Sequence, residues 1–149
     1  MKYKEVAEKL CKKYQTRDPF EIARQLGIQV FYGHYGTIRG YYNKIIQQRM
    51  IHINEALDEQ QQTIVCAHEL GHAIFHPDTN TPFLRANTFF AVSRLELEAN
   101  KFAADLLWSD DDLREYQYWT VPQVAALLGV SDEIAEYRML SVVPRLQEV

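Results

Sequence analysis

The spacing of hydrophobic residues predicts two helices at the start of the chain. Val6, Leu10 and Tyr14 recur every four residues, with lysines and glutamates between them, as is typical of an amphipathic helix. A second helix begins within Asp18–Glu21, where an N-cap aspartate precedes a proline at the first helical position and a glutamate is placed to close a capping box. Gly27 is expected to end that helix.

The next three runs are short, rich in β-branched and aromatic residues, and separated by glycine or polar stretches. They cover Ile28–Tyr32, Ile38–Tyr42 and Met50–Ile53. Runs of this kind are typical of strands joined by short turns. The sequence therefore predicts a small antiparallel three-stranded sheet.

A long helix is predicted over Glu55–Phe75, and Pro77 must end it because proline cannot continue the hydrogen-bond ladder. The segment Asp78–Val92 shows no clear hydrophobic period and is expected to be a loop. Ser93 then opens another helix. One face of that helix is apolar and consists of Leu95, Ala99, Phe102, Ala103, Leu106 and Leu107.

The last third of the chain predicts two short helices around a tight turn. Thr120–Gln123 fits a capping-box start, Gly129 a stop and Ser131 a second cap. We expect an α+β protein, with the small sheet packed on a mostly helical core. The whole chain, residues 1–149, is expected to be one domain, with about 117–149 as a C-terminal extension that resembles a helix-turn-helix.

Composition supports one self-sufficient core. With 149 residues, of which 47% are hydrophobic, the chain can bury enough surface to fold without a disulfide or a metal. No apolar run approaches the length of a spanning helix, and lysines are scattered through Met1–Tyr14 where a signal peptide would be apolar. Cys11 and Cys66 are expected to be reduced thiols. These features predict a cytoplasmic protein that does not enter a membrane.

The net charge of −4 is unevenly distributed. Residues 1–50 hold 10 Lys and Arg against 4 Asp and Glu, whereas residues 51–149 hold 6 against 16. An acidic chain gains little from a phosphate backbone, so general nucleic-acid binding is disfavoured. The basic first part is interpreted as solvated helix faces, with contact to an acidic partner as the alternative.

The most informative residues form a His-Glu-x-x-His pattern, His68-Glu69-Leu70-Gly71-His72, inside the predicted long helix. Four residues make about one turn, so both imidazoles project from one face about 6 Å apart along the axis and can bind one zinc ion. Glu69 lies beside that face, where it can take a proton from an attacking water and pass it to a leaving amine. The alternative is a pair of structural histidines without chemistry.

A catalytic zinc typically takes three ligands from the protein, so a third must be found. His76 lies about 12 Å along the helix axis from His68, too far to share one metal, and is interpreted as a supporting or structural residue. The better candidates are Glu96 and Glu98, because the helix that carries them can fold back across the motif helix.

Capping helps to choose between the two glutamates. Ser93 and Glu96 fit a capping box, which would give Glu96 a role at the backbone. Glu98 has no such role and directly precedes the small Ala99, where the two helices can approach closely. We predict Glu98 as the third ligand, with Glu96 as the alternative. Asp105 is expected either to accept a hydrogen bond from a ligand histidine or to be solvated.

Two segments resemble the ImmA/IrrE family of metallopeptidases. They are His-Glu-Leu-Gly-His-Ala-Ile-Phe-His at 68–76 and Glu-Leu-Glu-Ala-Asn-Lys-Phe-Ala-Ala-Asp-Leu-Leu at 96–107. Ile-His-Ile-Asn at 51–54 is also similar to a strand of that family. The resemblance covers roughly residues 20–140 and implies a zincin-like (gluzincin) core.

The resemblance also implies the site and its setting. In that family two motif histidines and a glutamate of the second motif hold zinc, which here implies His68, His72 and Glu98, with Glu69 as general base. It further implies phages, conjugative elements and bacterial chromosomes as the setting. The implied substrate is a helix-turn-helix repressor, whose cleavage releases silenced genes.

The leading hypothesis is a zinc endopeptidase of narrow specificity. A chain of this size has little room for a deep cleft, so we expect an extended substrate to add to an edge of the sheet along Met50–Asn54. The alternative is a binding module that holds zinc and docks on its partner without proteolysis. Glu69 argues against it, because a structural zinc site needs no adjacent base.

A third hypothesis is DNA binding through Val121–Leu140, the helix-turn-helix-like part. Its second helix begins Asp132-Glu133 and adds Glu136, with Arg138 as its only base, so phosphates would repel it. We expect no nucleic-acid partner. The sequence does not determine the oligomeric state.

Overall fold

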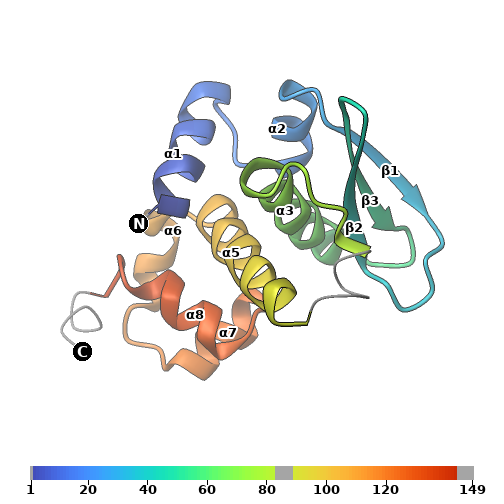
Figure 1. Cartoon of the computed structure of the whole chain (residues 1–149). Coiled ribbons are helices and arrows are strands. Elements are labelled where there is room, and N and C mark those ends of the chain that lie inside the picture. Colours follow the sequence, from blue (N-terminus) through green and yellow to red (C-terminus); the bar gives the residue numbers. More distant parts are fainter. Residues whose placement is uncertain (1, 83–88, 144–149) are drawn as a thin grey trace. The chain divides into compact units, whose positions relative to one another are not determined.

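The computed structural model describes residues 2–82 and 89–143 of the 149-residue chain. The chain divides into two compact units, Met1–Leu107 and Trp108–Val149, whose elements are labelled in Figure 1. The predicted start of the C-terminal extension, near residue 117, lies inside the second unit, and the single-domain organisation stays a prediction. Within the described ranges, no helix is both long and apolar enough to cross a membrane.

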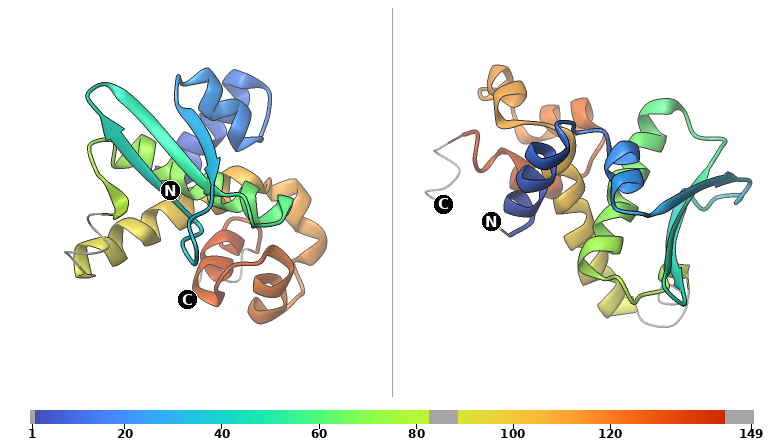
Figure 2. Two further views of the ribbon diagram at one scale, coloured as in Figure 1. Left: turned by 90° about the vertical axis from the view of Figure 1, so that its right-hand side faces the viewer. Right: turned by 90° about the horizontal axis from the view of Figure 1, so that it is seen from above.

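The first unit packs its helices on one face of a small sheet (Figures 1 and 2) and confirms the α+β class. Its central helix α3 contacts the sheet on one side and helix α5 on the other, as Figures 1 and 2 show. The elements in chain order are α1 (Lys2–Tyr14), α2 (Pro19–Gln25), β1 (Gln29–Gly33), β2 (Gly40–Ile45), β3 (Gln48–Asn54), α3 (Glu59–Phe75) and α5 (Phe89–Leu107).

Most helix ends follow the capping signals. The Asp18 side chain accepts the backbone N–H of Phe20 at the start of α2, and Gly27 has the positive φ of +74° that a chain reversal after a helix requires. Glu21 does not close a capping box: its carboxylate pairs with Arg24 one turn later. The short side chain of Asp18 therefore caps α2 alone.

Helix α3 starts later than its hydrophobic pattern predicted. Asp58 is its N-cap and forms a capping box with Gln61, so the predicted start at Glu55 is four residues too early. The helix ends at Phe75, as the nearby Pro77 requires. This fixes the orientation of the His-Glu-x-x-His segment, which lies in the second half of a regular helix.

The sheet is mixed, so the prediction of an antiparallel sheet is wrong for one strand. The strand order is β1-β3-β2, and β3 lies in the centre. Strand β3 is antiparallel to β2, to which the tight turn at Ile46 joins it, but parallel to β1. The chain crosses from one edge of the sheet to the other between β1 and β2. Alternating residues reveal strands but carry no information on their direction.

Small residues bring α3 and α5 into close contact. A Cβ added to Gly71 would lie 3.1 Å from the Cα of Ala99, so the two helix backbones nearly touch at this point. This confirms the expected close approach at Ala99. Cys11 and Cys66 are buried and form no disulfide. The core of the unit is built around Ile22, Tyr42, Ile51, Ile53, Leu70, Phe102 and Leu106.

Helix α5 begins at Phe89, so the predicted loop over Asp78–Val92 is wrong at its end, and residues 83–88 of that loop lie outside the described residues. Ser93 therefore lies inside the first turns of α5 and cannot be its N-cap. The apolar segment Phe89–Val92 extends the helix beyond the cap-like pattern. Glu96 therefore does not belong to a capping box at the start of α5, contrary to the prediction.

The described part of the second unit, residues 108–143, contains helices and no strand. Its elements are α6 (Asp110–Leu113), the short 3-10 helix Arg114–Tyr116, α7 (Val121–Leu128) and α8 (Asp132–Met139). A capping box at Thr120, a left-handed Gly129 and an N-cap at Ser131 confirm the predicted boundaries. The helices enclose Leu113, Val124, Leu128, Ala135, Met139, Val142 and Val143.

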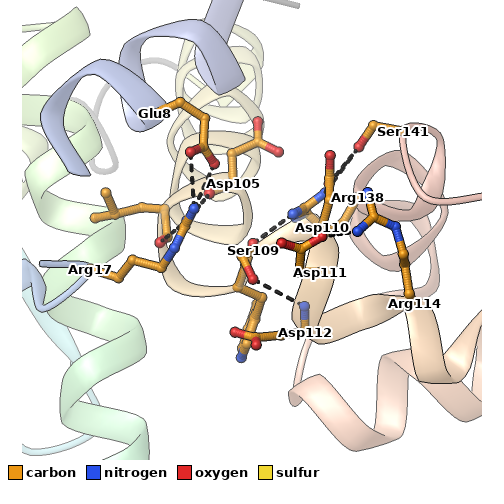
Figure 3. Close-up of polar contacts among 12 residues, drawn as sticks. Glu8, Arg17, Asp105, Ser109, Asp110, Asp111, Asp112, Arg114, Arg138 and Ser141 are labelled. Carbon is orange, nitrogen blue, oxygen red and sulfur yellow. Dashed lines mark hydrogen bonds and ion pairs between the residues drawn. The ribbon is translucent and has the colours of Figure 1, made fainter. Parts of the chain in front are cut away.

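A buried arginine lies at the centre of this second unit. Arg138 is 1% exposed, and its guanidinium donates to Asp110 Oδ1 at 2.8 Å and to the carbonyl of Trp108 at 2.6 Å, as Figure 3 shows in part. Arg138 is the only basic residue of α8, and it is thus unavailable to a phosphate. The exposed side chains of this helix include the acidic Asp132 and Glu136. The expectation of no nucleic-acid partner stays a prediction.

Candidate metal centre

Helix α3 presents His68 and His72 to α5, while the Glu69 side chain lies toward Gly40 of strand β2. The metal-binding atoms of His68, Glu69 and His72 all lie within 4.8 Å of one another. Glu69 and His72 are each only 1% exposed. The four-residue spacing places both imidazoles on one face, as the sequence predicted.

Glu96 on α5 reaches both imidazoles. Its Oε2 lies 2.8 Å from His68 Nε2, and its Oε1 lies 3.0 Å from His72 Nε2. Each oxygen of the Glu96 carboxylate therefore lies within hydrogen-bond distance of the Nε2 atom of one motif histidine. This places two imidazoles and a carboxylate from the opposite helix around one point.

The structure does not bring Glu98, the predicted third ligand, to these two nitrogens. Glu98 accepts a hydrogen bond of 2.6 Å from the Tyr3 hydroxyl and lies 3.5 Å from His76 Nε2. Two residues correspond to about 200° around a helix, so Glu96 and Glu98 point in different directions. The geometry favours Glu96, the alternative that the sequence analysis had set aside through its capping argument.

The second ring nitrogen of each histidine also has a partner. His68 Nδ1 lies 2.7 Å from Asn100 Oδ1, and His72 Nδ1 lies 3.0 Å from His76 Nδ1. No sequence pattern singled out Asn100, although it lies one helical turn after Glu96 on the same face of α5. An amide oxygen can only accept, so the contact with Asn100 requires a proton on His68 Nδ1, which lets Nε2 offer its lone pair when a metal ion is bound.

Asp105 is not the partner of either motif histidine, because Asn100 and His76 occupy those positions. Asp105 is buried near the end of α5, so the alternative of a solvated aspartate does not hold. Arg17 donates to the backbone carbonyls of Asp105 and Leu106 there (Figure 3). This end of α5 is thus a structural contact with the segment between α1 and α2.

The electrostatics of the cluster suit a cation. Burial alone raises the pKa of the Glu96 carboxyl, but its hydrogen bonds and charge interactions with His68 and His72 outweigh burial and hold that pKa well below its usual range. Glu96 is therefore ionised at neutral pH. Burial lowers the pKa of His76, and the neighbouring His72 lowers it further. His76 is therefore mostly neutral.

The residues fit a divalent metal. Two imidazole nitrogens and one carboxylate form a donor set that catalytic zinc sites use, and the partners of the Nδ1 atoms hold the rings in place. A structural site would close the coordination with a fourth protein ligand. Here the additional carboxylate in the cluster belongs to Glu69, whose position in the motif suits it to act as a base.

The sheet edge available to a substrate differs from the predicted one. Strand β3, which holds Met50–Asn54, pairs with a neighbour on both sides and offers no edge. On the edge strand β2, the Thr81 hydroxyl bonds both the N–H and the C=O of Tyr42. An extended peptide therefore cannot add along β3, and on β2 it would compete with Thr81 at Tyr42.

A protein-family model described as the IrrE N-terminal-like domain, of a peptidase family, matches residues 23–140. The match includes the motif helix, Glu96 and the helices of the second unit up to Leu140. The chain belongs to the ImmA/IrrE family of metallopeptidases. This confirms the family resemblance, and it makes the chain a peptidase whose chemistry implies a divalent metal.

Two relatives match most of this ImmA/IrrE chain. "Uncharacterized immunity region protein 2" of Bacillus phage phi105 is 38% identical over 93% of this chain and 89% of its own length. "Metallopeptidase ImmA" of Bacillus subtilis (strain 168) is 30% identical over 91% of this chain and 83% of its own length.

Among solved structures, a "Mycobacterium tuberculosis transcriptional regulator" is similar to the chain with a TM-score of 0.60. The sequence identity is 16%, and the match covers 93% of this chain and 47% of the regulator. This likeness supports the fold alone.

Proposed function

We propose that this chain is a zinc endopeptidase of narrow specificity that cleaves a helix-turn-helix repressor and thereby derepresses genes of a phage or mobile element. His68, His72 and Glu96 hold the zinc ion, and Glu69 is the general base. The proposal replaces Glu98 with Glu96 as the third ligand. It rests on the family and on the geometry between α3 and α5.

The observation that carries the proposal is the position of the Glu96 carboxylate, one oxygen near each motif Nε2, with Glu69 in the same cluster. Two helices far apart in sequence supply this set. A docking protein without proteolysis would need no buried carboxylate beside the metal ligands. The 1% exposure of Glu69 therefore supports catalysis over docking.

Zinc, when bound, supplies a Lewis acid that makes a water molecule easier to deprotonate and polarises the scissile carbonyl. Glu69 removes the proton from the attacking water and delivers it to the amine that leaves. Asn100 and His76 hold the two imidazoles, so the reacting groups meet in a fixed geometry. Burial of Glu69 keeps bulk water from competing for that proton.

The names of the relatives support a repressor as the substrate, and a contact at the sheet edge supports narrow specificity. The relatives are named as an immunity region protein of a phage and as the metallopeptidase ImmA, and immunity in a phage depends on repression of its genes. The Thr81 contact at the edge of β2 supports narrow specificity, because a peptide must displace it to pair with Tyr42.

The test is to incubate the purified chain with the repressor encoded beside its gene, with and without a chelator. We expect cleavage at one or a few bonds, which the chelator abolishes and added zinc restores. Glu69→Gln should bind zinc and leave the repressor intact. Binding of intact repressor without cleavage by the zinc-loaded chain would favour the docking alternative and overturn the proposal.

A further inference from the structure

The two motif histidines are supported in different ways. His68 Nδ1 contacts the exposed Asn100, whereas His72 Nδ1 contacts the buried His76, which in turn faces Glu98. Tyr3 of helix α1 donates to the other oxygen of Glu98. A chain of side chains thus runs from His72 through α3 and α5 to the N-terminal helix.

The contacts give this chain a direction. The Tyr3 hydroxyl donates to one oxygen of Glu98 over 2.6 Å, and His76 Nε2 lies 3.5 Å from the other, so both neighbours face acceptor atoms of Glu98. Burial and the bond to Glu98 raise the pKa of Tyr3 to about 12, so its hydroxyl keeps its proton and donates. Both neighbours of Glu98 therefore turn their protons toward it.

His76 Nε2 faces an acceptor oxygen of Glu98 and His76 Nδ1 faces His72, so a proton on Nε2 is the arrangement that suits both contacts. At 3.5 Å the contact with Glu98 is too long for a strong hydrogen bond, so the preference is mainly electrostatic. The Nδ1 of His76 is then bare and accepts from His72 Nδ1 over 3.0 Å. With its proton on Nδ1, His72 can offer the Nε2 lone pair to a metal ion on the side that Glu96 faces.

We propose that His76, Glu98 and Tyr3 are positioning residues that fix the ring and tautomer of His72 for metal binding. The inference rests on the proposed metal site and extends it to helix α1. Tyr3 lies before residue 23, where the match to the family model starts. Its ring also packs edge-on against Phe75, near the end of α3, which holds α1 beside the motif helix.

The test compares variants of His76 that separate the hydrogen bond from packing. His76→Leu fills the buried space without an acceptor, whereas His76→Gln keeps an amide oxygen that can accept from His72. Partners of a metal-binding histidine typically change metal affinity by about tenfold to a hundredfold. Zinc affinity is measured by competition with a chelating indicator, and cobalt(II) absorption reports the geometry of the coordination.

We expect zinc affinity to fall at least about tenfold in His76→Leu and to recover most of the way in His76→Gln. Tyr3→Phe, at the far end of the chain, should weaken it by about twofold to fivefold, while Tyr14→Phe in the same helix should leave it unchanged. The cobalt spectrum should change in His76→Leu. Circular dichroism and thermal unfolding confirm that each variant folds.

The outcomes separate this inference from the proposed function. If folded His76→Leu and Tyr3→Phe bind zinc as tightly as the unmodified chain, while His72→Ala loses it, the positioning chain is wrong and the metal site stands. If His72→Ala itself binds zinc at full affinity, the proposed metal site is wrong. Equal loss in His76→Leu and His76→Gln would also overturn the inference, because the acceptor would then not matter.

Discussion

Both units of the molecule bury a polar cluster among their described residues, and the two clusters are built differently. In the first unit, the Nε2 atoms of His68 and His72 meet the Glu96 carboxylate between two long helices. In the second unit, the Arg138 guanidinium is surrounded by acceptors, among them Asp110 Oδ1 and the Trp108 carbonyl.

The difference shows how to distinguish a site from a structural cluster. A guanidinium has donors only, and its acceptors here match it, so the Arg138 cluster holds short helices together and offers nothing to a ligand. Imidazole nitrogens and carboxylate oxygens that converge on one point can all donate a lone pair to a metal cation. The first cluster is therefore expected to bind a metal ion, and the second is expected to stabilise the fold.

The largest expected effect concerns the base in the first cluster. Glu69→Gln should lower the rate of repressor cleavage by at least about a hundredfold, because the amide keeps the size of the carboxylate but cannot take a proton. Zinc content and thermal unfolding should stay near those of the unmodified chain. Cleavage at an unchanged rate by zinc-loaded Glu69→Gln would mean that this cluster works without the proposed base.

The second cluster should affect stability and leave the chemistry alone. Arg138→Ala should lower the free energy of unfolding by about 2–3 kcal/mol, because it leaves buried acceptors without their donor. Arg114→Ala is the matched control: this arginine pairs with Asp111 on the surface of the same unit and should change stability by less than about 0.5 kcal/mol. Urea unfolding measures both. Equal effects of the two variants would contradict the structural role of Arg138.

A single buried hydroxyl should give a smaller effect than Arg138 and serves as a reference for both clusters. Tyr42 donates to the carbonyl of Pro77 at 2.7 Å, and Tyr42→Phe should cost about 1 kcal/mol near neutral pH. Burial is the main reason that the pKa of Tyr42 is raised from 10.0 to about 12 in the folded chain. The raised pKa means that the native state favours the neutral form of the Tyr42 hydroxyl.

The stabilisation from the raised pKa of Tyr42 is therefore complete below pH 10 and is lost as the pH rises through about 12. Urea unfolding at several alkaline pH values should show a smaller loss of stability in Tyr42→Phe than in the unmodified chain. Parallel pH profiles for the two proteins would contradict this assignment.

The sequence predicted features that depend on local chemistry. The caps at Asp18, Thr120 and Ser131 and the left-handed Gly129 set helix boundaries that the structure confirms. The His-Glu-x-x-His spacing likewise needs only a regular helix to place its imidazoles together. Each of these signals lies within about one helical turn, so distant parts of the fold do not alter it.

Features that depend on distant packing were not predictable in the same way. The cap-like pattern at Ser93 is overridden because apolar residues from Phe89 onward extend α5, and the direction in which Glu96 points follows from how α5 packs on α3. The parallel pairing of β1 depends on the path of the chain across the sheet. No local pattern marks Arg138 as buried, because its helix is otherwise acidic and exposed at its start.

Metal content in two neighbouring variants tests the central claim most directly. The purified chain should hold about one zinc ion per molecule, because two imidazoles and a carboxylate match the preferred donor set of zinc. Glu96→Ala should lose the zinc ion, whereas Glu98→Ala should stay loaded at micromolar zinc with an affinity lowered by no more than about tenfold. Full zinc in folded Glu96→Ala together with its loss in Glu98→Ala would contradict the account, because the third ligand would then be Glu98.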